Sequence, residues 1–193
     1  MTKVPVTGRL TRAEADFQSR VAVARRTGGD RLVVVCDAGV RLPTSFLAVE
    51  RQAPSAQWQF EGLSPVAAVA VGLLGCAAAL GVAMPADQAD FLADPPCRLE
   101  LSPEGVVIVT PVAAVATHPL LGSTMAHAWI EGLVPVAVIV DLGSIQHLTS
   151  VVIAWQLQLL QNCRPAPFSV RNANPGVTTQ LKQLRLDYLM ALG

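Results

Sequence analysis

Hydrophobic positions along the chain form unbroken runs rich in β-branched residues, and this pattern occurs twice. The runs cover residues 31–36 and 136–140, and each is followed directly by an aspartate, Asp37 or Asp141. Unbroken runs of this kind are typical of strands that are buried on both faces of a sheet. We therefore predict two interior strands, one in each half of the chain.

Shorter runs, in which apolar and polar residues alternate, begin at Trp58 and Phe168. Each leads to a small polar residue, Ser64 or Asn174, that a proline follows directly. Alternation predicts a short strand, while serine and asparagine are favoured helix N-caps and proline is favoured at the first helical position. Both segments are therefore predicted to be a strand followed by a helix.

The same order of elements extends further along both halves. Residues 4–10 and 106–112 are strand-like, and each of these segments precedes a helical stretch. Downstream of each aspartate, a Thr-Ser pair marks the start of another predicted helix, at residues 44–45 and 149–150. The order strand, helix, strand, helix, strand, helix thus occurs twice. Alternating strands and helices predict an α/β fold in which helices partly cover a sheet.

A polar segment with several prolines and aspartates, residues 85–97, lies between the two copies of this order. Such composition is typical of a linker. We therefore predict two tandem units, residues 1–84 and 98–193, each a small mixed sheet partly covered by helices.

One apolar run, residues 66–84, is long enough to span a bilayer. Its content is mostly alanine, glycine and valine with few leucines, and no basic cluster flanks it to set an orientation. A buried helix of a soluble domain explains the run better than a transmembrane helix, so we expect no stable membrane insertion.

Charge and composition narrow the classes of function. The chain has 14 Lys and Arg against 14 Asp and Glu, so it lacks the basic excess of a nucleic-acid-binding protein. Hydrophobic residues make up 52% of the chain, which argues against disorder. No Lys or Arg occurs between Arg98 and Arg164. Because a surface so poor in charge is poorly protected against association, we expect a protein partner.

Motifs for metal binding or catalysis are missing from the sequence. The four cysteines form no CxxC pair, and the three histidines, His118, His127 and His147, are isolated, so we expect no metal site. We find no glycine-rich phosphate loop, no pair of carboxylates suited to acid–base catalysis, and no nucleophile with a base. We expect a non-enzymatic protein without a cofactor. The absence of an apolar signal core near Met1 favours a cytoplasmic, reduced protein.

The helix that begins at residues 149–150 is predicted to be apolar on two sides. One stripe is expected to face the sheet, and its members recur at helical spacing: Ile153, Leu157 and Leu160. The other stripe lies on the opposite side: Val151, Trp155 and Leu159. This second stripe could pack against the other half, bind a separate partner or a second copy, or be enclosed within its own unit. In the preceding helical stretch, Leu121, Met125 and Trp129 are predicted core residues.

The sequence from Asp141 to Ala154, with the letters DLGSIQHLTSVVIA, resembles the central signature of STAS domains. In that family a strand ends in Asp-Leu, and a short loop, Asp-Ser-Ser-Gly-Leu and a helix follow. The later strand and Asn-Pro helix start within residues 170–177 are also typical. Residues 8–11, Gly-Arg-Leu-Thr, resemble the family's Gly-Glu-Leu-Asp. The similarity covers most of residues 98–193 and is weaker over residues 3–83.

Two positions of the signature differ from the family. Thr149, or Thr44 in the first half, stands where the family has aspartate, and Val152, or Leu47, stands where it has glycine. Ser150 and Ser45 fall at the family's phosphorylatable serine. The resemblance therefore implies four phosphoacceptor candidates: Ser150, Thr149, Ser45 and Thr44. A hydroxyl at this place can also simply cap the helix, and His147, just before it, could contact a phosphate or lie free at the surface.

The family includes bacterial anti-anti-sigma factors, stressosome subunits and the cytoplasmic tails of anion transporters. The resemblance implies a non-enzymatic regulatory or scaffold protein that binds a kinase-like anti-sigma factor or scaffold subunit, or that self-associates. The alternative is a small-molecule or lipid-handling accessory subunit of a transport ATPase. The first function predicts a flat apolar surface centred on Trp155, and the second predicts an enclosed apolar pocket.

Overall fold

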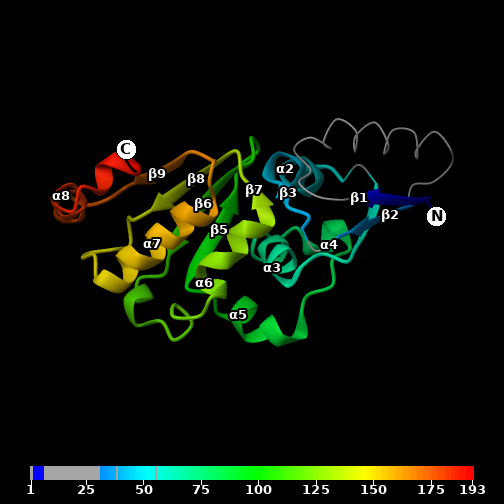
Figure 1. Ribbon diagram of the computed structural model, residues 1–193, viewed down its shortest axis with the longest axis horizontal. Coiled ribbons are helices and arrows are strands. Elements are labelled where there is room, and N and C mark those ends of the chain that lie inside the picture. Colours follow the sequence, from blue (N-terminus) through cyan, green and yellow to red (C-terminus); the bar gives the residue numbers. More distant parts are fainter. Residues whose placement is uncertain (1, 7–30, 38, 55) are drawn as a thin grey trace.

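The computed structural model describes residues 2–6, 31–37, 39–54 and 56–193, and these residues form a mixed α/β fold. Figure 1 shows two sheets at opposite ends of the long axis, with the N-terminus beside the smaller sheet and the C-terminus beside the larger. The predicted α/β class is confirmed. The first predicted helical stretch and the motif at residues 8–11 lie outside the described residues.

The smaller sheet contains three parallel strands in the order β1-β2-β4. Their bounds are Thr2–Val6 for β1, Arg31–Cys36 for β2 and Gln57–Glu61 for β4. The predicted interior strand is therefore β2, which lies between the other two. Its central residues Leu32, Val33 and Val34 are fully buried, as the unbroken apolar run requires.

The larger sheet contains five strands in the order β10-β9-β8-β6-β5. Only β5 is antiparallel to its neighbour, and the other pairs are parallel. The bounds are Cys97–Leu101 for β5, Val106–Pro111 for β6, Ala137–Asp141 for β8, Phe168–Arg171 for β9 and Ala191–Leu192 for β10. The second predicted interior strand is β8, between β6 and β9. In both sheets, the strand that carries or precedes the aspartate thus lies between two parallel neighbours.

Helices connect the parallel strands, as parallel pairing demands. They include α2 (Thr44–Gln52), α7 (Ser150–Asn162) and α8 (Pro175–Gln183), whereas α3 (Pro65–Leu73) follows β4 and leads towards the second half. Both predicted Ser/Asn-Pro helix starts are confirmed. The Ala67 N–H donates to Ser64 Oγ at 3.2 Å, and the Val177 N–H donates to Asn174 Oδ1 at 2.9 Å.

The helical stretch predicted after β6 is not one helix. It consists of η2 (Val115–Thr117), α6 (Met125–Ala128) and η3 (Trp129–Gly132), joined by turns. Leu121 and Trp129 are buried as predicted, and Met125 is partly buried. Figure 1 shows α6 and α7 on the same side of the larger sheet.

The apolar run of residues 66–84 is divided between two helices, α3 and α4 (Ala77–Leu80). Gly75 and Gly81 take positive φ values of 69° and 57°, which end α3 and α4 respectively and which other residues rarely adopt. Residues 67–71 of α3 are buried. The expectation of a single helix was therefore wrong, and burial in the core is confirmed for residues 67–71, 74, 76 and 80 of the run. Within the described part of the chain, no helix is long and apolar enough to cross a membrane.

Residues 85–97 are more structured than a linker. They contain η1 (Ala86–Gln88) and α5 (Ala89–Ala93), and Cys97 already belongs to β5. Phe91 of α5 is buried in the core. This segment therefore packs against the rest of the protein while it connects the first half, the described residues up to 84, to the second half, residues 98–193.

The two halves meet mainly through elements other than α2 packed against α7, although the start of α2 contacts the β5–β6 turn. The short strands β3 (Leu42–Pro43) and β7 (Leu133–Val134) pair in parallel across the junction, and α3 packs against η3. A Cβ atom at Gly132 would lie 2.4 Å from Ala67 Cα, so only glycine allows this approach. Buried apolar side chains from both halves form one continuous cluster. The alternative in which the second apolar stripe of α7 packs against the other half therefore does not describe the main junction, which is made by α3, β3 and β7.

Candidate functional site

The predicted Thr-Ser helix start of the second half is confirmed at α7. The Val152 N–H donates to Thr149 Oγ1 at 3.4 Å, so Thr149 is the N-cap and Ser150 is the first helical residue. Both residues are exposed. The capping role therefore belongs to Thr149, and the Ser150 hydroxyl lies at the surface.

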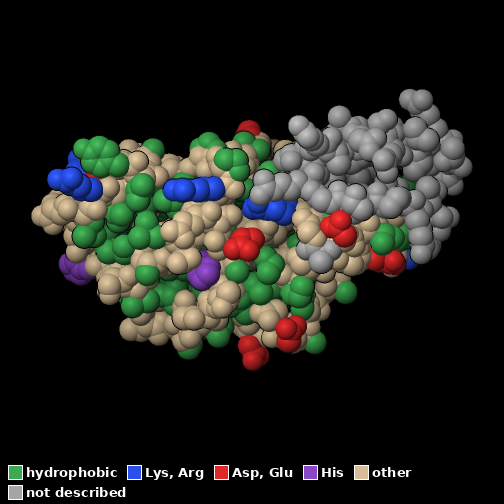
Figure 2. All heavy atoms as spheres, viewed as in Figure 1, with side chains coloured by type: hydrophobic (Ala, Val, Ile, Leu, Met, Phe, Trp, Pro, Cys, Tyr) green, Lys and Arg blue, Asp and Glu red, His purple; other side chains and the backbone are tan. Residues whose placement is uncertain are grey.

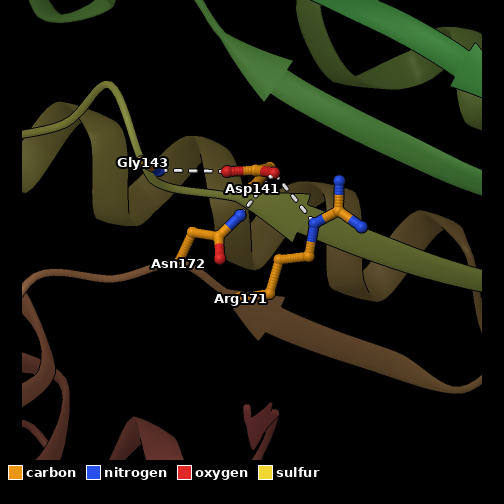
Figure 3. A network of polar contacts seen from close by, with 4 residues as sticks. All are labelled: Asp141, Gly143, Arg171 and Asn172. Atoms are coloured by element: carbon orange, nitrogen blue, oxygen red, sulfur yellow. Dashed lines mark hydrogen bonds and ion pairs between the residues drawn. The ribbon is translucent and has the colours of Figure 1, made fainter.

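A network around Asp141 fixes the loop that leads to this helix start (Figure 3). Asp141 stands at the end of β8, where its carboxylate accepts hydrogen bonds from the Gly143 N–H at 3.1 Å, Arg171 Nε at 2.8 Å and Asn172 Nδ2 at 2.9 Å. Burial by itself raises the pKa of this carboxyl, but the three hydrogen bonds and the Arg171 charge outweigh it, so its pKa is lower than usual. The carboxylate therefore stays ionised and anchors the loop to the end of β9.

The rest of the loop is held by α8 and its cap. Asn174 Nδ2 donates to the Ile145 carbonyl at 3.0 Å, and the Leu148 N–H donates to Gln180 Oε1 at 3.1 Å. Leu142, Ile145 and Leu148 point into the core and are buried. The exposed residues that remain form the surface that we call the α7 start: Gln146, His147, Thr149, Ser150 and Val151.

The two apolar stripes of α7 do not lie as predicted. The buried residues are Val152, Trp155, Gln156, Leu159 and Leu160, whereas Ile153 and Leu157 are only partly buried. Trp155 Nε1 donates to the Ala126 carbonyl of α6 at 2.8 Å. Trp155 and Leu159 are therefore enclosed within their own half, which is one of the three alternatives. Of the three partner-binding candidates, only Val151 is presented to solvent, with 49% of its surface exposed.

The equivalent helix start in the first half is covered by the second half. Thr44 is fully buried, and its hydroxyl donates to the Gly105 carbonyl and accepts a hydrogen bond from the Val136 N–H at 3.1 Å. A Cβ atom at Gly105 would lie 2.7 Å from the Ser45 nitrogen. The turn between β5 and β6 thus sits directly on the start of α2, and Thr44 is not accessible for modification. This corrects its selection as a phosphoacceptor candidate.

The aspartates of the two halves share one local motif. The Gly39 N–H donates to Asp37 Oδ1 at 2.9 Å, as the Gly143 N–H does to Asp141 Oδ1. The partners Arg171 and Asn172 were missed from the sequence. Their position at the end of the strand before the Asn-Pro helix start could have indicated them, because the ends of neighbouring parallel strands lie side by side.

The cysteines are buried, and His118 and His127 each lie beside a polar side chain. All four cysteines are buried and free, and burial raises the pKa of Cys36 and of Cys97 to about 12. His127 Nδ1 lies 3.1 Å from Asn162 Nδ2, and His118 Nε2 lies 3.4 Å from an Asp94 oxygen. Among the described residues, no group of three or more His, Cys, Asp and Glu could hold a metal ion.

Comparison with known proteins adds no relative, because no protein-family profile matches the sequence and no curated protein matches it significantly.

Proposed function

We propose that this chain is a non-enzymatic regulatory or scaffold protein that binds a protein partner through the α7 start. The proposal includes two tandem STAS-like units, residues 1–84 and 98–193. It is supported by the equal order of β1-β2-β4 and β6-β8-β9 and by the Asp-Leu strand end, the capped helix and the Asn-Pro helix start of the second half. The unpaired cysteines favour a cytoplasmic location.

One observation carries the protein-binding proposal. In the first half, the Thr-Ser helix start is in contact with another segment of the chain. The β5–β6 turn accepts a hydrogen bond from the Thr44 hydroxyl and contacts Ser45. In the second half, the Thr-Ser helix start is open to solvent, and the Asp141 network anchors the loop that leads to it. An exposed Thr-Ser helix start is therefore suited to binding a protein in trans, because the other Thr-Ser helix start of the chain contacts protein.

Phosphorylation of Ser150 would control this contact. Ser150 lies in the first turn of a 13-residue helix, where amide groups and the helix dipole favour an anion. A phosphate there would add nearly two negative charges to the α7 start without disturbing the cap, which Thr149 supplies. We therefore expect the modified form to be stable and to bind its partner more weakly.

A photo-crosslinking amino acid at position 151 tests the proposal in the native host. The matched control carries the same amino acid at Val49, which is 57% exposed on α2. The proposal expects a discrete protein adduct, or a crosslinked second copy, at position 151 only, and its loss when Ser150→Asp is added. Equal adducts at both positions, or none at position 151, would refute it.

The alternative, a small-molecule or lipid-handling subunit, has one observation in its favour. A hollow of about 440 Å³ lies between α3, α4, α5 and β5, and apolar side chains such as Leu73, Met84 and Leu92 line most of it. This hollow is open to solvent rather than enclosed, which suits a lipid less well than a closed pocket. Native mass spectrometry of the purified protein discriminates the two functions: a bound lipid supports the alternative, and a ligand-free mass supports the protein-binding proposal.

A further inference from the structure

A second hollow, of about 530 Å³, lies at the junction of the two halves. Its walls come from the loop before β3, the start of α3, η3 and the end of α7. In Figure 2 basic side chains lie over the end of α7 and beside α2, around this junction. Its volume falls within the usual range of small-ligand sites, about 300–1,000 Å³.

Two arginines, one from each half, line this hollow. Arg41 Nη2 donates to the carbonyl of Asn162, the last residue of α7, at 3.4 Å, so the Arg41 guanidinium lies against the end of that helix. Arg164 lines the same hollow two residues further along the chain. Burial raises the pKa of the Cys163 thiol to about 11, and the positive charges of Arg164 and Arg41 both act to lower it. The two positive charges therefore converge on one region.

The start of α3 contributes a third source of positive potential. Proline occupies the first position of this helix, and the Ser64 side chain accepts its hydrogen bond from the Ala67 N–H. Val66, which lines the hollow, has an N–H with no hydrogen-bond partner among the described residues. An N–H at a helix start is a donor suited to an oxyanion. Among the described lining residues, Glu131 is the one acid, and its negative charge opposes these donors.

We propose that the junction hollow binds a small oxyanion, a phosphate- or carboxylate-bearing metabolite, between the guanidiniums of Arg41 and Arg164 and the start of α3. Guanidinium groups bind such planar or tetrahedral oxyanions through paired hydrogen bonds. Because α7 is about 20 Å long, the site lies far from the α7 start. It is therefore a second site, independent of the proposed protein contact, and its ligand bridges both halves.

Isothermal titration of the full chain with inorganic phosphate and, separately, with citrate, at constant ionic strength, tests the site. The two probes distinguish a phosphate from a carboxylate ligand. We expect saturable binding of at least one of them. Arg41→Gln and Arg164→Gln should each weaken that binding about tenfold to a hundredfold, the usual effect of losing a hydrogen bond from a charged group. The control Arg98→Gln, an exposed arginine outside this hollow, should bind as the parent does.

Glu131→Gln should change the affinity in the opposite direction, and this test does not require the two arginine variants to fold. Glu131 is exposed, so its replacement should leave the fold intact, and removal of its negative charge should tighten binding. Tighter binding by this variant together with weaker binding by the arginine variants supports the site. Absence of saturable binding of both probes, or equal affinities for all variants, overturns it, and neither result bears on the α7 start.

Discussion

Replacement of Thr44 by valine tests how the two halves are joined. Valine has nearly the same shape as threonine but lacks the hydroxyl, so the buried Gly105 carbonyl and the part-buried Val136 N–H both lose their partner. A buried polar group left unsatisfied costs about 1–3 kcal/mol, and the Val136 N–H, which water can reach, falls at the low end. We therefore expect Thr44→Val to lower the free energy of unfolding by about 2–4 kcal/mol.

Thr44→Ser is the matched control, because it keeps the hydroxyl and removes one buried methyl group, which costs about 1 kcal/mol. Urea unfolding followed by tryptophan fluorescence measures both variants, since Trp58 reports on the first half and Trp129 and Trp155 on the second. The prediction requires the valine variant to be clearly less stable than the serine variant. A valine variant as stable as the serine variant would show that the Thr44 hydroxyl does not join the halves.

Three further predictions concern the second half. Trp155→Glu should lower the free energy of unfolding by at least about 3 kcal/mol and should not affect binding alone, because the indole is only 3% exposed. Chemical denaturation measures this loss, and a variant as stable as the parent would contradict the prediction. Gln156→Leu should raise the melting temperature, because the Gln156 side-chain amide is fully buried and has no hydrogen-bond partner among the described residues. A calorimetric scan that shows a lower melting temperature than that of the parent would contradict this prediction. The carboxyl of Asp141 has a lowered pKa, so its stabilising effect is complete above about pH 4 and declines as the pH falls through its folded-state pKa. The stability difference between the parent and Asp141→Asn should therefore shrink in acid unfolding below about pH 4, and a difference independent of pH would refute the ionised network.

Local rules explain why much of the fold could be predicted from the sequence. The interior strands β2 and β8 follow from unbroken β-branched runs, and the starts of α3 and α8 follow from cap residues before proline. These features depend on neighbours within a few residues. The division of the run of residues 66–84 also had a local signal, because Gly75 and Gly81 stand where helix ends require a positive φ.

The parts that could not be predicted depend on residues far apart in the sequence. A helix that is apolar on several sides leaves open which side faces the core, and only the position of α6 places Trp155 inside. The Asp141–Arg171 contact depends on the register of β8 against β9. Thr44 is the first residue of α2 and is covered by the β5–β6 turn, 61 residues away, whereas Thr149 is the exposed N-cap of α7. Sequence reasoning therefore selected the two helix starts correctly but could not tell which of them is accessible.

The central claim is that the α7 start binds a protein partner and that charge at Ser150 weakens the contact. Its most direct test is the dissociation constant of the crosslinked partner for the parent, Ser150→Ala and Ser150→Asp, measured by surface-immobilised binding with thermal unfolding of each variant as a control. All three proteins should unfold within about 1 kcal/mol of one another, because Thr149 supplies the cap and aspartate suits a helix start. We predict that Ser150→Ala binds nearly as tightly as the parent and that Ser150→Asp binds at least about tenfold more weakly, a loss of about 1.4 kcal/mol. Equal dissociation constants for Ser150→Asp and the parent would contradict the claim and leave Ser150 as an ordinary residue of the first helical turn.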